Sequence, residues 1–349
     1  MKKRNLILVF FLIGLMLPAS AQRKFSVYGI GFYNQENLFD TCHDEGKNDY
    51  EYLPMGTNRW DARKYEHKLR NMARALADMG TDKLLGLGCA VIGLSEVENA
   101  RALEDLIAQE PLRARNIKYV HVEGPDRRGV DCAMLYNPAL FTVKDVKLYP
   151  YVQELEADSA FYTRGFLAVQ GMLANELITV IVCHWPSRFS ESFYRESAAR
   201  QVRIIKDKLL QENPDNKIIV MGDLNDDPTN KSLTEGLSAK SEIKKTHDGD
   251  MYNPWYNYLV KQGTGTLQYD GGWNLFDQIL MTPNMLDRKG TKDYSSLTYL
   301  NSQIFRRDYL IQTEGKYKGN PKRTFAGGVW LDGFSDHLPV VVYLVKEQK

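Results

Sequence analysis

Apolar, β-branched runs that lead straight into polar clusters are the feature that most constrains the fold of this chain of 349 residues. The runs 178–182 and 218–220 consist only of Ile, Val and Thr. Such continuous runs are typical of strands buried on both faces. The predicted strands are Phe25–Tyr33, Ala90–Leu94, Lys118–Glu123, Asp131–Tyr136, Gly165–Leu173, Leu177–Cys183, Lys217–Met221, Leu275–Met281 and Pro339–Val345.

Two segments have helical periodicity instead. Asp61 is a candidate N-cap for a helix that ends near Gly80, and a second helix is predicted from about Glu191 to Gln211. Strands with covering helices indicate a layered α/β protein. The segment Arg288–Arg323 is polar and weakly periodic, so we expect a long irregular loop there.

The N-terminus has the layout of a secretory signal peptide. Basic residues 2–4 precede the apolar run Leu6–Leu17, and Pro18–Ala21 offers a small-residue cleavage site. The run is shorter than the ~20 residues that a membrane-spanning helix needs, so no stable membrane anchor is expected. We therefore predict a signal peptide at 1–21 and one exported domain at 22–349, periplasmic or secreted and monomeric.

The charge balance argues against bulk attraction to nucleic acid. Removing the three basic residues 2–4 from the total of 45 leaves 42 Lys and Arg against 44 Asp and Glu. Any affinity for a phosphate backbone would therefore have to be local. The widely spaced cysteines disfavour a zinc site and do not require a disulfide: Cys42, Cys89, Cys132 and Cys183.

Polar clusters follow or open most of the predicted strands. They are 34–37, 95–99, 184–188, 223–226, the residue Asp277 and 335–337. Each cluster alone could be an ordinary turn, because Asp and Asn favour turns. Together they favour one site, since α/β proteins gather functional groups at strand ends.

The residue types in these clusters indicate a chemistry. Carboxylate and amide oxygens suit hard cations such as Mg²⁺, Mn²⁺ or Ca²⁺. Phosphoester hydrolysis needs charge neutralisation on the phosphoryl oxygens, an in-line water and protonation of the leaving oxygen. Aspartate, histidine and a metal ion supply these functions.

The ordered set of polar residues resembles the endonuclease/exonuclease/phosphatase family, which includes deoxyribonuclease I. The set is Asn34, Glu96, His184, Asp223-x-Asn225, Asp277 and Ser335-Asp336-His337. The resemblance implies a four-layer sandwich of two packed mixed β-sheets covered by helices. It also implies a metal-dependent hydrolase that uses Mg²⁺ or Mn²⁺ and acts on a phosphoester substrate. Nucleic acid is one of the implied substrates.

The resemblance assigns a role to each position. Metal binding is implied for Asn34, Glu96 and Asp336, and phosphate contact for Arg164. The implied catalytic residues are His184, Asp223, Asn225, Asp277 and His337. Glu36 departs from the family pattern, where Asp is frequent, and Arg127 and Arg128 could bind a second phosphate or lie in a solvated loop.

Several functions stay open at this point. A phosphodiesterase or nuclease is the first expectation, and a sphingomyelinase-like phospholipase C or a phosphatase for small esters is the alternative. A non-catalytic binding module on the same fold is a distant third. A serine hydrolase is weaker still, because the sequence around Ser95 lacks the second glycine of a nucleophile elbow.

Overall fold

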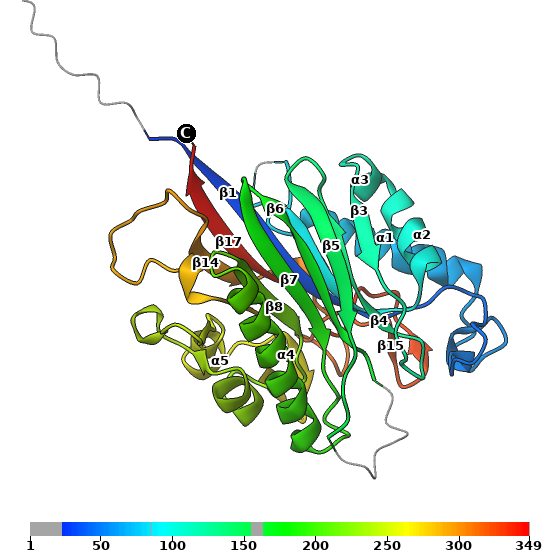
Figure 1. Ribbon diagram of the computed structural model, residues 1–349. Coiled ribbons are helices and arrows are strands. Elements are labelled where there is room, and N and C mark those ends of the chain that lie inside the picture. The colour runs from blue at the N-terminus through cyan, green and yellow to red at the C-terminus, as the bar shows by residue number, and fades with distance from the viewer. Residues whose placement is uncertain (1–22, 85, 155–162, 349) are drawn as a thin grey trace, which may run out of the picture.

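The computed structural model describes residues 23–84, 86–154 and 163–348, so the predicted signal peptide lies outside the described residues. Two sheets lie face to face, and helices cover their outer faces (Figure 1). The predicted four-layer α/β sandwich is therefore what the chain forms.

The first sheet has six strands in the order β14-β17-β1-β2-β4-β3. Its central pair, β1 and β2, is parallel, and β17 pairs antiparallel with β1 beside it. Strand bounds are β1 Phe25–Leu38, β2 Val91–Val97, β3 Lys118–His121, β4 Asp131–Tyr136, β14 Thr298–Ile304 and β17 Val340–Glu347.

The second sheet has seven strands in the order β5-β6-β7-β8-β13-β10-β9. Its parallel pair is β7 with β8. The bounds are β5 Phe141–Tyr149, β6 Phe166–Leu173, β7 Glu176–His184, β8 Lys217–Asp223, β9 Ala239–Lys240, β10 Met251–Tyr252 and β13 Asp277–Met281. Two short ribbons complete the strands: β11 Leu267–Tyr269 with β12 Gly272–Asn274, and β15 Phe325–Ala326 with β16 Val329–Trp330.

Three layers of buried side chains hold the sandwich together. Ile30 and Val91 of the first sheet pack against Val180 and Ile219 of the second. The outer face of the first sheet is covered by the helices α1 Ala62–Asp78, α2 Ala100–Ala108 and α3 Glu110–Arg113. The outer face of the second is covered by α4 Ser192–Glu212, and α5 Tyr256–Val260 lies near β13.

The predicted helices begin and end close to the expected residues. The Asp61 side chain accepts a hydrogen bond from the Lys64 backbone N–H, as an N-cap does. The prediction for Arg288–Arg323 was wrong in part, because this segment contains β14, an edge strand paired with β17. The β14 side chains are mostly half-buried, so the sequence carries little apolar alternation there.

The cysteines are free thiols, with Cys42 exposed and Cys89, Cys132 and Cys183 buried. None of the helices in the described part of the chain is both long and apolar enough to span a membrane.

Candidate active site at the end of the two sheets

Three predicted catalytic residues lie side by side at one end of the second sheet. His184 ends β7, Asp223 ends β8 and Asp277 begins β13. The register pairs His184 with Asp223, and Asp223 with Asp277. Residues paired in this way have adjacent side chains on one face of the sheet, so the strand register assembles half of the site.

The first sheet contributes Asn34 and Glu96 through irregular strand ends. The register of β1 with β2 shifts after Asn34, and the register of β2 with β4 shifts around Glu96. Glu36, Asn37 and Glu96 have φ values of 46°, 59° and 59°, a left-handed region that non-glycine residues seldom adopt. Bulges of this kind redirect side chains. Here the Asn37 backbone N–H donates to Glu96 Oε2 at 3.0 Å and holds that carboxylate.

Asp223 is the centre of the site. Asn34 Nδ2 donates to its Oδ2 atom and the Asn225 backbone N–H donates to its Oδ1 atom, both at 3.0 Å. The Nε2 atoms of His184 and His337 each lie 3.8 Å from Asp223 Oδ2. Asp223 is 2% exposed. Asn34 from the first sheet and Asn225 from the second hold its carboxylate in one orientation.

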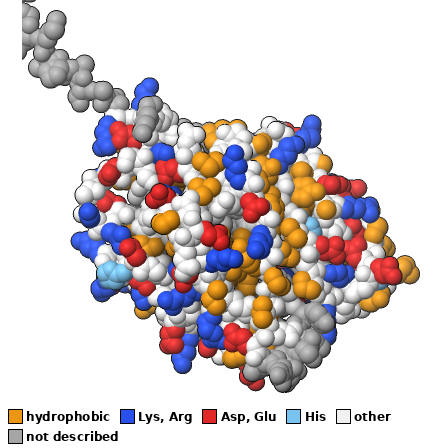
Figure 2. Space-filling view, in the orientation of Figure 1, with side chains coloured by type: hydrophobic (Ala, Val, Ile, Leu, Met, Phe, Trp, Pro, Cys, Tyr) orange, Lys and Arg blue, Asp and Glu red, His pale blue; other side chains and the backbone are white. Residues whose placement is uncertain are grey.

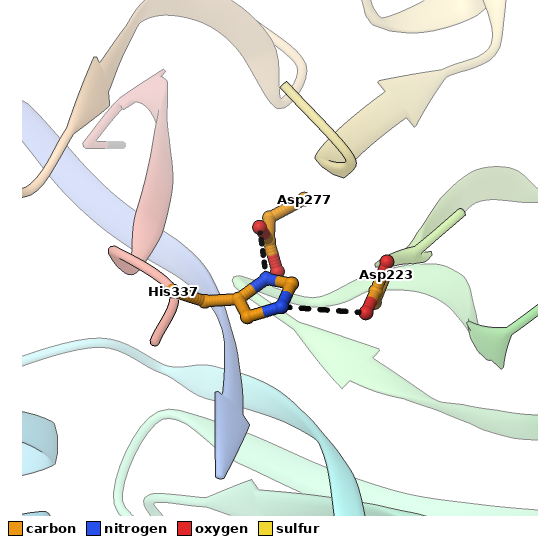
Figure 3. Close-up of side chains that lie close together, drawn as sticks. All are labelled: Asp223, Asp277 and His337. Atoms are coloured by element: carbon orange, nitrogen blue, oxygen red, sulfur yellow. Dashed lines mark hydrogen bonds and ion pairs between the residues drawn. The ribbon is translucent and has the colours of Figure 1, made fainter. Parts of the chain in front are cut away.

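His337 and Asp277 form a close pair beside this carboxylate. His337 Nδ1 lies 2.7 Å from Asp277 Oδ2, while its Nε2 atom faces Asp223 (Figure 3). Burial alone would lower the pKa of His337, but the charges of Asp277 and Asp223 raise that pKa well above its usual value. Burial also raises the pKa of Asp223. Only His337 has its charge partner at hydrogen-bond distance, so His337 takes the proton first and Asp223 is left as the carboxylate.

His184 lies on the opposite side of Asp223 in a different protonation state. Its Nε2 atom is 3.7 Å from Glu96 Oε1, and its Nδ1 atom is buried without a hydrogen-bond partner among the described residues. Burial lowers the pKa of His184 well below its usual value, and the charges of Arg164 and Arg128 add to that effect. His184 is therefore a neutral imidazole.

Asn225 and Arg164 meet at the backbone of Trp185. Asn225 Nδ2 donates to the Trp185 carbonyl oxygen at 3.0 Å, and Arg164 Nη2 donates to the same atom at 3.2 Å. Arg164 Nη1 donates to Asp126 at 2.9 Å, and Arg164 is 9% exposed. Its guanidinium thus supports the chain just after β7, and its contact with phosphate stays a prediction.

Asp336 is joined to the end of the long excursion. Arg323 Nη2 donates to Asp336 Oδ2 at 2.7 Å, and Arg323 Nε lies 3.5 Å from Glu36 Oε1. The other Asp336 oxygen, Oδ1, lies 3.9 Å from His337 Nε2. Glu36, the residue that departs from the family pattern, therefore belongs to the support of Asp336.

Lys68 is a supporting residue next to the site that the sequence pattern did not single out. Its Nζ atom crosses from α1 to donate to Thr324 Oγ1 at 2.7 Å and to the Phe334 carbonyl oxygen at 2.6 Å. Burial lowers the pKa of Lys68, while the charge of Glu36 opposes that shift. A signal existed, because Lys68 lies on the apolar stripe of α1, one helical turn before Met72.

Arg188 is a second residue that supports the site, and the sequence pattern assigned no role to it. Its Nε atom donates to the Asn225 carbonyl oxygen at 3.1 Å, and its Nη atoms donate to Asn274 Oδ1 at 3.2 Å and Asp227 Oδ2 at 3.0 Å. Its guanidinium carbon also lies 4.2 Å from the centre of the Phe276 ring. Arg188 thereby joins the exits of β7 and β8 to the entry of β13.

The donor set fits a divalent cation. In the described part of the chain, one group of three metal-ligand side chains has donor atoms within 4.8 Å of one another, namely Asp223, Asp277 and His337. In that group His337 and Asp277 already satisfy each other by a hydrogen bond. The predicted metal ligands Glu96 and Asp336 lie outside this group. Their atoms Glu96 Oε1 and Asp336 Oδ1 lack a hydrogen bond to a described residue, and oxygen donors of this kind are those that a hard cation prefers.

Comparison with known proteins identifies solved structures of the same fold. No curated protein sequence matches the chain. Among solved structures, a mannosyl-6-phosphatase from Bacteroides thetaiotaomicron has 14% identity and a TM-score of 0.55, and the match covers 91% of this chain and 99% of that chain. An endonuclease/exonuclease/phosphatase family protein from the same organism has 14% identity and a TM-score of 0.54, with 93% and 100% covered.

A third solved structure has the same architecture. TDP2 from D. rerio, complexed with a single-strand DNA product, has 13% identity and a TM-score of 0.52, with 91% of this chain and 99% of that chain covered. At such low identity these likenesses establish the fold. Membership is established by sequence, because the family model described as "Endonuclease/Exonuclease/phosphatase family" matches residues 29–346. With that match and the expected polar set gathered at one end of two packed sheets, the chain belongs to the endonuclease/exonuclease/phosphatase family.

Proposed function

We propose that the protein is a metal-dependent phosphoester hydrolase that cleaves phosphodiesters by in-line attack of water. The observation that carries this proposal is the placement of Asp223. Its buried carboxylate is held by Asn34 and Asn225 and faces the Nε2 atoms of two histidines. That arrangement provides a base for a water molecule beside two groups that can contact phosphate.

The protonation states of these residues indicate which part of the reaction each one carries out. The Asp223 carboxylate orients the attacking water and accepts its proton, since the hydrogen bonds from Asn34 and Asn225 keep its oxygens in place. The protonated His337 donates from Nε2 to a phosphoryl oxygen, and Asp277 holds its ring through Nδ1. His184, which is neutral, places its imidazole between Glu96 and Asp223 without adding charge.

We propose Glu96 as the principal ligand of a Mg²⁺ or Mn²⁺ ion, with Asn34 and Asp336 beside it. When bound, such an ion neutralises charge on the phosphoryl and leaving oxygens. Within the protein, the hydrogen bonds from Asn37 to Glu96 and from Arg323 to Asp336 fix one oxygen of each carboxylate and leave the other available.

For the substrate we propose a class and one alternative class. The solved structure of D. rerio TDP2 with a single-strand DNA product supports a nucleic-acid phosphodiester. The mannosyl-6-phosphatase from Bacteroides thetaiotaomicron supports the alternative of a small phosphomonoester. Basic and acidic side chains are interspersed on the face drawn in Figure 2, so recognition of nucleic acid would depend on local contacts at the site.

A hydrolysis panel tests the proposal. Plasmid DNA, RNA, sphingomyelin, phosphoinositides and sugar phosphates are incubated with the protein and Mg²⁺, Mn²⁺ or a chelator. We expect metal-dependent cleavage of at least one phosphoester, and its loss in Asp223→Asn. The absence of hydrolysis across the panel, together with retained binding of a phosphoester, would identify a binding module instead.

A further inference from the structure

The positive charges around the site differ in how firmly they are held. Lys68, Arg164 and Arg323 are bound to neighbours at 2.6–2.9 Å, in buried or partly buried positions. Arg128 is different, because its side chain is 45% exposed and its guanidinium contacts are long. Its Nη1 atom lies 3.4 Å from Asn37 Oδ1, and its Nε atom lies 3.9 Å from Asp126 Oδ1.

The backbone of Arg128 is fixed even though its head group is not. Residues 126–129 form a turn in which the Gly129 N–H donates to the Asp126 carbonyl oxygen at 3.1 Å. Gly129 has a φ of 80°, which glycine adopts without strain. The Arg128 N–H also donates to Asp126 Oδ1 at 2.9 Å. Arg128 is thus a loosely held guanidinium on a rigid base.

Its contacts place Arg128 on the Glu96 side of the site. Asn37 accepts from Arg128 through its side chain and donates to Glu96 through its backbone. The guanidinium is therefore separated by one residue, Asn37, from the carboxylate that we propose as the principal metal ligand.

We infer that Arg128 is a substrate-binding residue whose guanidinium binds a non-bridging oxygen of the scissile phosphate, and that its contribution is larger for a phosphomonoester dianion than for a phosphodiester monoanion. This inference rests on the proposed function. Binding an anion costs Arg128 little, since the contacts it gives up are a long bond to a neutral amide and an ion pair at 3.9 Å. A guanidinium binds phosphate oxygens through paired N–H donors. A dianion gains more from this additional cation than a monoanion does.

Steady-state kinetics of Arg128→Gln and Arg128→Lys test the inference, with p-nitrophenyl phosphate as the dianion and bis(p-nitrophenyl) phosphate as the monoanion. Arg203→Gln is the matched control, because Arg203 is 42% exposed and makes an equally loose ion pair at 3.8 Å, on the outer helix α4. For Arg128→Gln we expect kcat/KM to fall about ten- to a hundredfold with the dianion, the range for losing a charge-assisted hydrogen bond. The loss with the monoanion should be smaller, and Arg128→Lys should recover part of the activity.

Binding of inorganic phosphate, measured by calorimetry, keeps this test separate from the proposed function. If the wild type hydrolyses neither compound and no phosphoester of the hydrolysis panel, the proposed function fails, and weaker phosphate binding by Arg128→Gln still supports the inference. Equal kcat/KM and equal phosphate affinity in wild type and Arg128→Gln would overturn it. So would a raised Mg²⁺ requirement with unchanged phosphate affinity, which would mean that Arg128 acts only through Asn37 on Glu96.

Discussion

Asp277→Asn tests the central electrostatic claim about the site. Asp277 is fully buried, and its Oδ2 atom lies 2.7 Å from His337 Nδ1. The amide keeps the shape of the side chain but removes the charge that most raises the pKa of His337. Burial then acts with less opposition, so we expect His337 to lose its proton at a lower pH in the variant.

The size of the effect follows from the lost interaction. A hydrogen bond to a charged group contributes about 1.5–3 kcal/mol, and one pKa unit corresponds to about 1.4 kcal/mol. The pKa of His337 should therefore fall by about one to two units. Because protonated His337 is the donor to phosphate, kcat/KM should fall by about ten- to a hundredfold at pH values above the lowered pKa, in proportion to the protonated fraction. Lowering the pH should restore part of the lost activity, until Asp223, whose pKa is raised by burial, takes up a proton as well.

The assay is a profile of kcat/KM against pH for wild type and Asp277→Asn, on whichever phosphoester the hydrolysis panel identifies. Asp145→Asn, on the exposed side of β5, is the control for the substitution itself. Unfolding by denaturant at several pH values gives a second readout. The raised pKa of His337 stabilises the fold below about pH 6.5, and this contribution is lost as the pH rises through the folded-state pKa. The stability difference between the proteins should therefore be largest at low pH. A variant with the wild-type pH profile and rate would refute the assignment of His337 as a cation held by Asp277.

Three further outcomes are expected from the same geometry. Asp223→Asn and His337→Ala should each lower turnover by about two to four powers of ten with the fold intact, as measured by kinetics and circular dichroism; near-normal turnover in either would contradict its role. Glu96→Gln should raise the Mg²⁺ concentration for half-maximal activity by about tenfold or more, and an unchanged metal titration would remove Glu96 as a ligand. Lys68→Met should reduce the free energy of unfolding by about 2–4 kcal/mol, because the Phe334 carbonyl oxygen loses its donor and the buried Glu36 loses a compensating positive charge; a change under about 1 kcal/mol in urea unfolding would show that this buried ammonium contributes little.

The local parts of the fold were readable from the sequence because their causes are local. The continuous apolar run 178–182 lies within β7, since a strand buried between a second sheet and a helix needs apolar side chains on both faces. Asp61 caps α1 because its carboxylate reaches the N–H of Lys64 three residues later. The edge strand β14 was missed because it is partly solvated and its stability comes from pairing with β17.

The candidate site, like the fold, depends partly on the local sequence and partly on the tertiary structure. Sequence alone determined which side chains end the strands, since the family's polar set recurs in order from Asn34 to His337. The tertiary structure decided which of them touch. Asn34 and Asp223 are 189 residues apart, His337 and Asp277 are 60 apart, and both contacts depend on strand register and sheet packing. The same long-range packing brings Arg164 into hydrogen-bond contact with Asp126, and Lys68 with Phe334. A sequence states what each side chain is able to do chemically, but only the folded chain fixes the partners that set its charge and its freedom to bind.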